Sequence, residues 1–556
     1  MDNPASRLPP VLRPDSPPTR ALADLAERFA REVRGDTTGR LVSGITLATA
    51  DLRAGEVFVA IRGANRHGAE FAAAAAEKGA VAVLTDEDGA ELAADAGLPI
   101  LVVDDPRGML GALSAWVYGT GADDDLPLLF ATTGTNGKTS VSHLLEGILG
   151  QLGVTSGLSS TAERHIAGEV IVSRLTTPEA SEMHALLALM RERGVEAVAV
   201  EVSAQALSRR RVDGLVFDVA GFTNLSHDHL DDYADMREYF EAKLPLFRPD
   251  RARKAVVCLD SAPGAEVAAR CEVPFVTVGT PDIADDPDAA ASADWTVEIL
   301  AERPAGTEFA LTSTDGRTLT TVVPVIGRHM AANAGLAIVM LLEGGYSWDR
   351  LRGALDASAG GTGRIDAYLP GRTQLVSGEH GPAVYVDFGH SPDAFEKTLA
   401  AVRRVTPGKV VMLVGADGDR DATKRLDMGR TSVLGSDILV ITDHHPRFED
   451  PDSIRATLIE GARRARPDAE IHEYSPPERA IVEAIRLVGE GDAILWAGPG
   501  HQDYRDIRGV RTPYSARELS RRALRAAGWD VPDSHWPVPY PDDETPDSDP
   551  LRPAFP

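Results

Sequence analysis

Residues 131–140, with the sequence ATTGTNGKTS, combine types and spacing suited to holding a phosphate group. An apolar run (126–130) precedes them and a helix-like run (141–149) follows, which predicts a strand, a glycine loop and a helix in succession. In such a loop, backbone N–H groups and the positive end of the helix dipole converge on an anion. Lys138 can reach the β- and γ-phosphates, and the Thr139 hydroxyl can bind Mg²⁺. ATP or GTP is therefore expected at Gly134, Thr135, Asn136, Gly137, Lys138, Thr139 and Ser140.

Three further positions could complete a magnesium site beside this loop. Glu201 ends an apolar strand-like run (197–201), and Mg²⁺ prefers oxygen ligands, although a strand-end glutamate can also be merely solvated. His229 belongs to a group of two histidines and two aspartates in residues 227–231, which would otherwise be read as a capped turn. Lys243 follows on an expected helix and, taken alone, would be a surface lysine.

Short apolar runs alternate with Ala-rich helical segments along most of the chain. Buried strands separated by helices predict parallel sheets with crossover helices, that is, an α/β protein. Ligands of such sheets bind beyond the carboxyl ends of the strands, which is where the motifs above fall. The glycine-rich residues 360–363 are expected to form a hinge between the second and third α/β units.

The acidic composition limits the classes of partner. A formal net charge of −27 over 556 residues argues against nucleic acid, because neutralising phosphates requires clustered Lys and Arg. No apolar run approaches the roughly 20 residues that span a bilayer, and the N-terminus lacks a signal-peptide shape. Residues 1–20 and 529–556 are rich in Pro, Asp and Ser, so we expect them to be disordered. We expect a monomeric, cytoplasmic protein that binds small molecules and neither nucleic acid nor membrane.

A longer series of motifs follows the phosphate loop in a fixed order. GTNGKTS, LTTPEA, EVSxxAL, TNLSxDHLD and YFEAK are succeeded by GRHMAANAGLAI (327–338), DFGHSPDAFEKTL (387–399), GDRDATKRLDMG (418–429), HPRFEDP (445–451) and GPGHQDY (498–504). This series resembles the Mur ligase superfamily of ATP-dependent amide ligases, and within it the MurE type, the UDP-N-acetylmuramoyl-tripeptide synthetases. The resemblance covers residues 40–525.

The resemblance implies a three-domain Mur ligase architecture. It comprises an N-terminal UDP-sugar-binding domain (21–125), a central P-loop ATPase domain (126–360) and a C-terminal Rossmann-like domain (361–528) that brings the amino acid. The implied reaction adds a diamino acid to UDP-N-acetylmuramoyl-L-alanyl-D-glutamate in peptidoglycan precursor synthesis, with ATP and Mg²⁺ as cofactors. A substrate carboxylate would attack the γ-phosphate of ATP, and an amine would then attack the resulting acyl phosphate.

The resemblance also implies roles for single residues. Lys138 matches the phosphate-loop lysine, Thr139, Glu201 and His229 match positions at the magnesium site, and Lys243 matches a lysine that is carbamylated in the family. Carbamylation would turn this cation into a carboxylate-like ligand. Asn333 and Arg364 match positions that hold the nucleotide. The matches to substrate-binding positions are Thr49, His67, Thr176, Thr177, Ser203, Arg211, Asp387, His390, Arg420, His444, His445, Pro446, Arg447, Gly498 and Gln502.

The sequence departs from the family pattern where substrates are expected to bind. In the uridine loop, residues 48–50 read Ala-Thr-Ala in place of Asp-Ser-Arg, and residues 204–205 read Ala-Gln in place of Ser-His. Residues 444–447 read His-His-Pro-Arg in place of the diaminopimelate signature Asp-Asn-Pro-Arg, and Gln502 replaces a glutamate. Arg447 can still grip a carboxylate, but the negative charges that would pair with a distal ammonium are missing.

Two hypotheses for the acceptor amine stay open. The amine is something other than meso-diaminopimelate, or waters and the paired histidines serve the same substrate. For the whole protein, the alternatives are a paralogue that joins a different carboxylate and amine in specialised metabolism, and an ATP-binding regulator. Adjacent histidines on an extended segment should point apart, so we do not expect His444 and His445 to bind one metal ion together.

Overall fold

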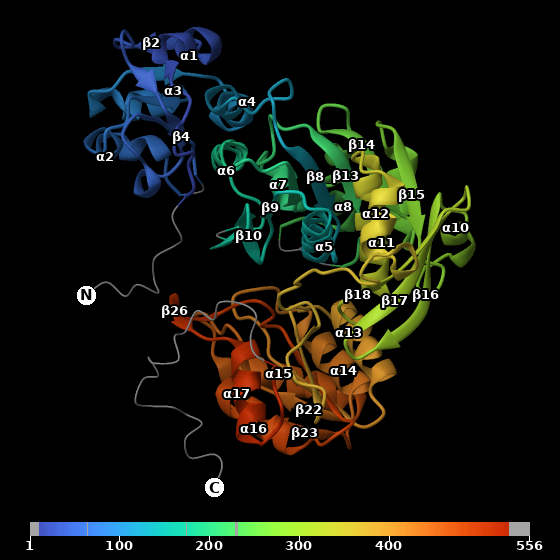
Figure 1. The fold of residues 1–556 in the computed structure, drawn as a ribbon. Coiled ribbons are helices and arrows are strands. Elements are labelled where there is room, and N and C mark those ends of the chain that lie inside the picture. The colour runs from blue at the N-terminus through green and yellow to red at the C-terminus, as the bar shows by residue number, and fades with distance from the viewer. Residues whose placement is uncertain (1–10, 64, 174, 228–231, 533–556) are drawn as a thin grey trace.

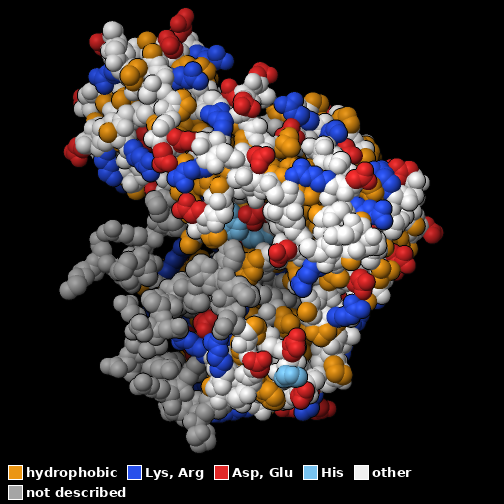
Figure 2. All heavy atoms as spheres, viewed as in Figure 1, with side chains coloured by type: hydrophobic (Ala, Val, Ile, Leu, Met, Phe, Trp, Pro, Cys, Tyr) orange, Lys and Arg blue, Asp and Glu red, His pale blue; other side chains and the backbone are white. Residues whose placement is uncertain are grey.

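The computed structural model describes residues 11–63, 65–173, 175–227 and 232–532. It shows three α/β domains in chain order, with the central domain between the other two (Figure 1). Within the described ranges, no helix is both long and apolar enough to cross a membrane. On the face drawn in Figure 2, Asp and Glu side chains are interspersed with Lys and Arg, so acidic charge is distributed over that face rather than gathered in one patch.

The N-terminal domain is built on a five-stranded sheet with the order β2-β7-β6-β5-β4. Only β2 runs antiparallel to its neighbour. The elements of this domain are β1 (Arg20–Ala21), α1 (Leu22–Phe29), β2 (Glu32–Arg34), β3 (Leu41–Val42), β4 (Gly44–Thr46), η2 (Thr49–Asp51), β5 (Glu56–Val59), η3 (Gly68–Phe71), α2 (Ala72–Glu77), β6 (Ala82–Thr85), α3 (Glu87–Leu92), η4 (Ala94–Ala96), β7 (Ile100–Val102) and α4 (Pro106–Tyr118).

The central domain contains an 11-stranded sheet with the order β11-β10-β9-β12-β8-β13-β14-β15-β16-β17-β18. Its middle strands pair in parallel, as the alternation of strands and helices predicts. Antiparallel pairs extend it at both edges. Its strands are β8 (Leu128–Thr133), β9 (Ser156–Ser159), β10 (Glu163–Ile166), β11 (Glu169–Val172), β12 (Ala197–Glu201), β13 (Phe217–Phe222), β14 (Ala252–Cys258), β15 (Phe275–Gly279), β16 (Trp295–Arg303), β17 (Gly306–Ser313) and β18 (Thr318–Val323).

Helices bury both faces of this sheet around β8. Phe130 contributes to the core formed with helices α5 and α11, whereas Leu129 and Ala131 contribute to the core on the α6 side, as the period of two along a strand requires. Burial on both faces fixes the end of β8, where the phosphate loop begins. The helices of this domain are α5 (Lys138–Gln151), α6 (Ala180–Glu192), α7 (Ala204–Ser208), α8 (Met236–Glu241), η5 (Leu244–Phe247), α9 (Ala262–Arg270), α10 (Pro287–Ala291), α11 (Arg328–Glu343), α12 (Trp348–Leu355) and η6 (Ala357–Ala359).

The C-terminal domain has a six-stranded sheet with the order β19-β20-β24-β21-β22-β23, parallel except for β19. The carboxyl ends of β24, β21 and β22 are therefore neighbours at one edge. Its elements are β19 (Gln374–Leu375), β20 (Ala383–Asp387), α13 (Pro392–Val405), β21 (Val410–Val414), α14 (Arg425–Gly435), β22 (Ile438–Ile441), α15 (Pro451–Ala465), β23 (Glu470–Glu473), α16 (Pro477–Arg486), β24 (Ala493–Ala497), β25 (Tyr504–Ile507), β26 (Val510–Pro513) and α17 (Ala516–Ala526).

Residues 360–363 do not form a free hinge. The Val322 N–H donates to the Gly363 carbonyl at 3.1 Å, and the Ile365 N–H donates to the Val322 carbonyl at 2.8 Å, which ties this stretch to β18. Ile365 and Leu369 belong to the central core. The chain therefore passes to the C-terminal sheet near residue 370 rather than at 360.

Parts of both ends that we expected to be disordered make defined contacts in the described residues. Arg13 donates from Nε to Glu56 Oε1 at 2.6 Å, and both side chains are buried in the N-terminal domain. A buried guanidinium needs such a counter-charge, which the composition of the leader does not reveal. At the other end, the Gly378 N–H donates to the Asp530 carbonyl at 3.1 Å, and Trp529 packs with the C-terminal core. Residues 1–10 and 533–556 lie outside the described residues.

Candidate active site

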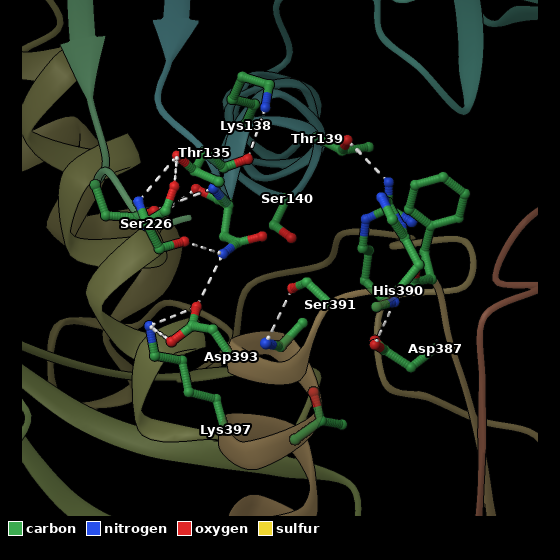
Figure 3. Close-up of a pocket in the computed structure, with 18 of the residues that line it drawn as sticks. Thr135, Lys138, Thr139, Ser140, Ser226, Asp387, His390, Ser391, Asp393 and Lys397 are labelled. Atoms are coloured by element: carbon green, nitrogen blue, oxygen red, sulfur yellow. Dashed lines mark hydrogen bonds and ion pairs between the residues drawn. The ribbon is translucent and has the colours of Figure 1, made fainter. Parts of the chain in front are cut away.

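The phosphate loop joins β8 to α5 and depends on two glycines in conformations that other residues rarely adopt. Gly134 has φ +149° and Gly137 has φ +90°. A Cβ at Gly137 would lie 2.6 Å from Asn333 Oδ1 on α11, so a side chain there would displace the Asn333 amide as well as adopt an unfavourable φ. Lys138 turns back over the loop, and its Nζ donates to the carbonyls of Gly134 at 3.1 Å and Thr135 at 2.8 Å (Figure 3).

Residues after β13 brace the loop from its other side. The Thr135 N–H donates to the Asn224 carbonyl at 2.8 Å, and the Asn136 N–H donates to Asn224 Oδ1 at 3.0 Å. Thr223 Oγ1 in turn donates to the Asn136 carbonyl at 2.7 Å. The conformation of the loop is thus fixed by a neighbouring parallel strand. The TNLS motif therefore has a physical function that sequence reasoning did not assign to Thr223 and Asn224.

Thr139 and Glu201 lie together at the start of α5. Glu201 ends β12, which pairs with β8, and its side chain is buried. Thr139 Oγ1 donates to Glu201 Oε2 at 3.0 Å, and the Thr161 N–H donates to the same oxygen at 2.8 Å. A hydroxyl and a carboxylate at a strand edge beside a phosphate loop form the oxygen donor set that suits Mg²⁺.

Arg372 is a site residue that sequence reasoning missed. Its Nη2 donates to Thr139 Oγ1 at 2.9 Å, and its guanidinium lies 4.5 Å from the centroid of the Phe388 ring. Burial lowers the pKa of this guanidinium, although Glu201 and Asp387 oppose that shift. The predicted nucleotide residue Arg364 is exposed and does not line the cavity. For Arg372, the signal available in the sequence was the Pro-Gly-Arg stretch at 370–372, which ends one residue before β19.

Lys243 lies beneath the phosphate loop. It follows the end of α8 rather than lying within a helix as expected, and only 1% of its surface is exposed. Its Nζ donates to the Gly134 carbonyl at 2.9 Å and lies 4.2 Å from the centroid of the Tyr239 ring. It is therefore not the surface lysine that its surroundings in the sequence suggest. The other expected metal ligand, His229, lies outside the described residues.

A cavity of about 1190 Å³ extends from the phosphate loop to the carboxyl edge of the C-terminal sheet. Asn136 Nδ2 donates across it to Asp393 Oδ2 at 3.2 Å, and Lys397 Nζ donates to the same carboxylate oxygen at 3.1 Å (Figure 3). The two domains thus meet at the loop itself. The predicted residues that line the cavity are Thr135, Asn136, Gly137, Lys138, Thr139, Ser140, Thr176, Glu201, Ser203, Arg211, Asn333, Asp387, His390, Arg420, His444, Arg447, Gly498 and Gln502.

Other predicted residues lie behind this lining. Thr177 is fully buried, and its Oγ1 donates to the Glu201 carbonyl at 2.8 Å, so it supports the glutamate from the rear. Gly134 contributes its carbonyl to the two lysines described above. His445 is buried behind Gln502, and Pro446 lines a separate recess on the outer surface.

Two histidines at the far end of the cavity lie closer together than expected. The rings of His444 and His445 have centroids 4.2 Å apart, and ligand atoms of Asp417, His444 and His445 all lie within 4.8 Å of one another. The expectation that these rings point apart is wrong, because they follow the end of β22 and do not belong to a strand. Both ring nitrogens of His445 are engaged, since Nε2 donates to Gln502 Oε1 and Nδ1 accepts from the Asp506 N–H, each at 2.9 Å.

Sequence profiles of three Mur ligase regions match this chain. They are the Mur ligase middle domain at residues 132–341, the glutamate ligase domain at 371–500 and the Mur ligase family catalytic domain at 41–118. A UDP-N-acetylmuramyl-tripeptide synthetase of Leifsonia xyli is 55% identical over 521 residues, which cover 94% of this chain and 99% of the relative. The chain belongs to the Mur ligase family.

Further relatives agree with this assignment. The UDP-N-acetylmuramoyl-L-alanyl-D-glutamate–2,6-diaminopimelate ligase of Streptomyces coelicolor is 40% identical over 509 residues, covering 91% of this Mur ligase and 96% of the relative. A solved structure of a ligase with the same name aligns with a TM-score of 0.62 and 24% identity, covering 92% of this chain and 99% of its own. The three-domain α/β fold of the family is thereby confirmed.

In this Mur ligase, the two predicted substrate residues of the N-terminal domain do not line the cavity. Thr49 lies in η2, where its carbonyl accepts from Lys78 Nζ at 2.7 Å. His67 is buried and caps η3, because its Nδ1 accepts from the Ala69 N–H at 3.0 Å while its Nε2 donates to Asp86 Oδ1 at 3.0 Å. His67 therefore has a structural role within its own domain.

Proposed function

We propose that this Mur ligase joins the amino group of an amino acid to the carboxylate of UDP-N-acetylmuramoyl-L-alanyl-D-glutamate in peptidoglycan precursor synthesis. The γ-phosphoryl group of ATP passes to the substrate carboxylate, which forms an acyl phosphate, and ADP is the leaving group. The amine then attacks the acyl carbon, and phosphate leaves as the amide bond forms. The relatives at 55% and 40% identity bear names of this activity.

One observation carries the proposal: a single cavity contains a phosphate loop and the carboxyl edge of a second sheet. A transfer that couples ATP to amide formation needs both substrates held near one phosphate, and proximity of this kind supplies much of the rate enhancement. A regulator that only binds ATP has no need for the Asp417, His444 and Gln502 cluster at the other end of the same cavity.

The roles that we propose follow from the geometry of the site. Lys138 would turn from the loop carbonyls to the β- and γ-phosphates, where its charge offsets that of the transferred group. Thr139 and Glu201 would hold Mg²⁺, which supplies further neutralisation of the phosphates when bound. Thr176 and Arg211 line the same region and would receive the muramoyl peptide.

The reaction is tested by measuring phosphate release with each substrate omitted in turn. We expect release only when ATP, the UDP-linked dipeptide and an amino acid are all present, and a product whose mass equals that of the joined substrates. Phosphate release that does not depend on the amine would favour the regulator instead.

Lys243 offers a second test, because a carbamylated lysine would act through its carboxylate. Lys243→Ala should lose most activity and regain part of it with added short carboxylic acids, which can occupy the same position. Lys254→Ala is the matched control, since Lys254 is half-exposed and pairs with Glu343 away from the cavity. Full activity of Lys243→Ala would show that the metal site has been misassigned.

We also propose that the protein acts as a monomer in the cytoplasm on small-molecule substrates, without nucleic acid or membrane. Light scattering on the purified protein at assay concentration should give the mass of one chain, 59.2 kDa. A stable dimer whose dissociation changes the activity would contradict this.

A further inference from the structure

His143 lies one helical turn beyond the phosphate loop, on the face of α5 that carries Thr139. Residues four apart on a helix are neighbours on its surface, so the two side chains leave the helix in the same direction. His143 is 2% exposed, and both of its ring nitrogens are engaged. Nδ1 lies 3.1 Å from the Tyr368 carbonyl oxygen, and Nε2 lies 3.1 Å from Ser160 Oγ. The phosphate chemistry proposed above uses none of these three residues.

The protonation of His143 fixes the direction of both hydrogen bonds. Burial lowers the pKa of the ring well below 6.5, so the ring is neutral and carries one N–H. A carbonyl can only accept, so Nδ1 carries the proton and donates to Tyr368. Nε2 is then an acceptor for the Ser160 hydroxyl. That hydroxyl also lies 3.0 Å from the Glu163 carbonyl, but this carbonyl already accepts from the Ser160 N–H at 3.1 Å.

On one side of α5, Ser160 belongs to the connection that holds the proposed metal ligand. The next residue, Thr161, donates its N–H to Glu201 Oε2 at 2.8 Å. The Thr161 hydroxyl donates to Thr176 Oγ1 at 2.9 Å, at the wall of the cavity. Ser160 is fully buried, and its Oγ accepts from the Glu163 N–H at 3.2 Å. A shift of Ser160 would therefore move the N–H group that orients the Glu201 carboxylate.

On the other side, Tyr368 lies in the segment that brings Arg372 to Thr139. Arg372 Nη2 donates to Thr139 Oγ1 at 2.9 Å, four residues after Tyr368. The Tyr368 hydroxyl accepts from Arg517 Nη1 on α17 at 3.0 Å. The backbone of Tyr368 is thus bonded to the central domain and its side chain to the C-terminal domain. Two successive turns of α5 therefore contact this segment, one through Thr139 and the other through His143.

We propose that His143 is a positioning residue of the magnesium site, which holds Glu201 and Arg372 in fixed places on the two sides of α5. The inference rests on the proposed function, in which Thr139 and Glu201 hold Mg²⁺. Groups that orient metal ligands without touching the metal change its affinity by about 10- to 100-fold. Loss of His143 would leave a buried hydroxyl and a buried carbonyl without this partner, which favours movement of both segments. The network does not reach the amino-acid end of the cavity.

The test measures metal binding without turnover. Mn²⁺ is the probe, and its binding to the full-length protein in the presence of ADP is followed by electron paramagnetic resonance. His143→Leu removes both hydrogen bonds at similar volume and should raise the Mn²⁺ dissociation constant by about 10-fold. His143→Gln keeps an N–H for the Tyr368 carbonyl and an oxygen for Ser160, so it should stay within about threefold of wild type. In turnover, His143→Leu should raise KM for ATP and leave KM for the amino acid unchanged.

Ser160→Ala removes the same contact from its other partner. It should also weaken Mn²⁺ binding, and adding it to His143→Leu should change the dissociation constant by less than about twofold, because the two residues act as a pair.

His184→Leu is the matched control. His184 is fully buried and both of its ring nitrogens are engaged, by Thr120 Oγ1 at 2.7 Å and by the Asp213 carbonyl at 3.0 Å. It lies on α6, which packs on the opposite face of the central sheet from α5. Its replacement should leave the Mn²⁺ dissociation constant within about twofold of wild type.

Each outcome decides one question. Wild-type affinity for Mn²⁺ in His143→Leu or in Ser160→Ala overturns the role of His143, and Ser160→Ala decides alone if His143→Leu does not fold. A loss in His143→Gln or His184→Leu equal to that in His143→Leu also overturns it, because the cause would not be the hydrogen bonds.

Two further outcomes separate this inference from the proposed function. Mn²⁺ binding that Glu201→Gln does not weaken overturns the metal assignment, and the role of His143 with it. Phosphate release that never depends on an amine overturns the ligase reaction alone, because Mn²⁺ binding requires no turnover.

Discussion

The two ends of the cavity are built in different ways. At the phosphate loop, backbone groups make most of the contacts: Thr135 and Asn136 bond to Asn224, and Lys138 bonds to loop carbonyls. At the C-terminal edge, side chains bond to side chains, as in Asp417 with His444 and His445 with Gln502. Backbone contacts survive most substitutions, whereas a side-chain pair changes with either partner. The geometry of the nucleotide end therefore depends less on pairs of side chains than the geometry of the amino-acid end does.

Removing the phosphate-loop lysine should have the largest effect and should not depend on the acceptor. Lys138→Ala takes away a positive charge aimed at the transferred phosphoryl group, and we expect kcat to fall by about 10³-fold or more. The fall should be equal for every amino acid tested. A loss that varied from one amino acid to another would contradict the independence of the two ends.

Arg372 contacts both sides of the cavity. Its removal should lower activity less than the removal of Lys138 does. Arg372→Ala deletes the hydrogen bond to Thr139 and the contact with Phe388, so we expect kcat/KM for ATP to fall by about 10- to 100-fold. Arg364→Ala is the paired control and should behave as wild type, since Arg364 is exposed and away from the cavity. The reverse result would support the prediction that Arg364 holds the nucleotide.

A substitution at Gln502 changes the charge of the amino-acid end and leaves the phosphate loop as it is. Gln502→Glu should raise kcat/KM for amino acids with a distal ammonium by about 10-fold while KM for ATP stays unchanged.

The Gln502→Glu substitution should also change how the stability of the folded protein responds to acid. Burial and the nearby His444 lower the pKa of His445 to about 4, so wild-type stability falls as pH drops below 6.5. A carboxylate at 502 would raise that pKa, and melting curves at pH 5 and 7 should show a smaller loss.

Removing the hydrogen bond between Asn136 and Asp393 should have the smallest effect on activity. Asp393 accepts from Asn136 but is one-third exposed and shared with Lys397, so water can replace it. We expect Asp393→Asn to lower kcat by about two- to threefold. A loss of 100-fold would mean that this contact, and not Arg372, controls how the two domains come together.

The sequence predicted the nucleotide end better than the amino-acid end. The succession of strand, loop and helix around Lys138 and the pairing of Thr139 with Glu201 both follow from local patterns, because parallel strands bring their carboxyl ends to one edge. The family resemblance placed Lys243 near the site, although its residue type alone suggested the surface. The position of His229 stays a prediction.

What the sequence did not reveal depends on contacts between distant segments. Arg13 is buried because Glu56 lies opposite, and residues 360–363 are held by β18, yet neither segment looks structured by composition. Asp417 was missed because its importance comes from His444, which follows the next strand. The capping of η3 by His67 was not foreseen, since capping by histidine has no distinctive pattern in sequence, and the contact of His67 with substrate stays a prediction.

Arg372 lies just after the chain enters the C-terminal domain, and the profile of that domain begins at residue 371. The domain that we propose to select the amino acid thus carries, within its own boundaries, an arginine that donates to Thr139 beside the phosphate loop. Recombination that exchanged this domain between ligases would transfer a part of the nucleotide site together with a new amino-acid preference. Chimeric enzymes joined at residue 370 would inherit that arginine from the donor of the specificity domain, whereas a junction made beyond residue 372 would keep the recipient's own.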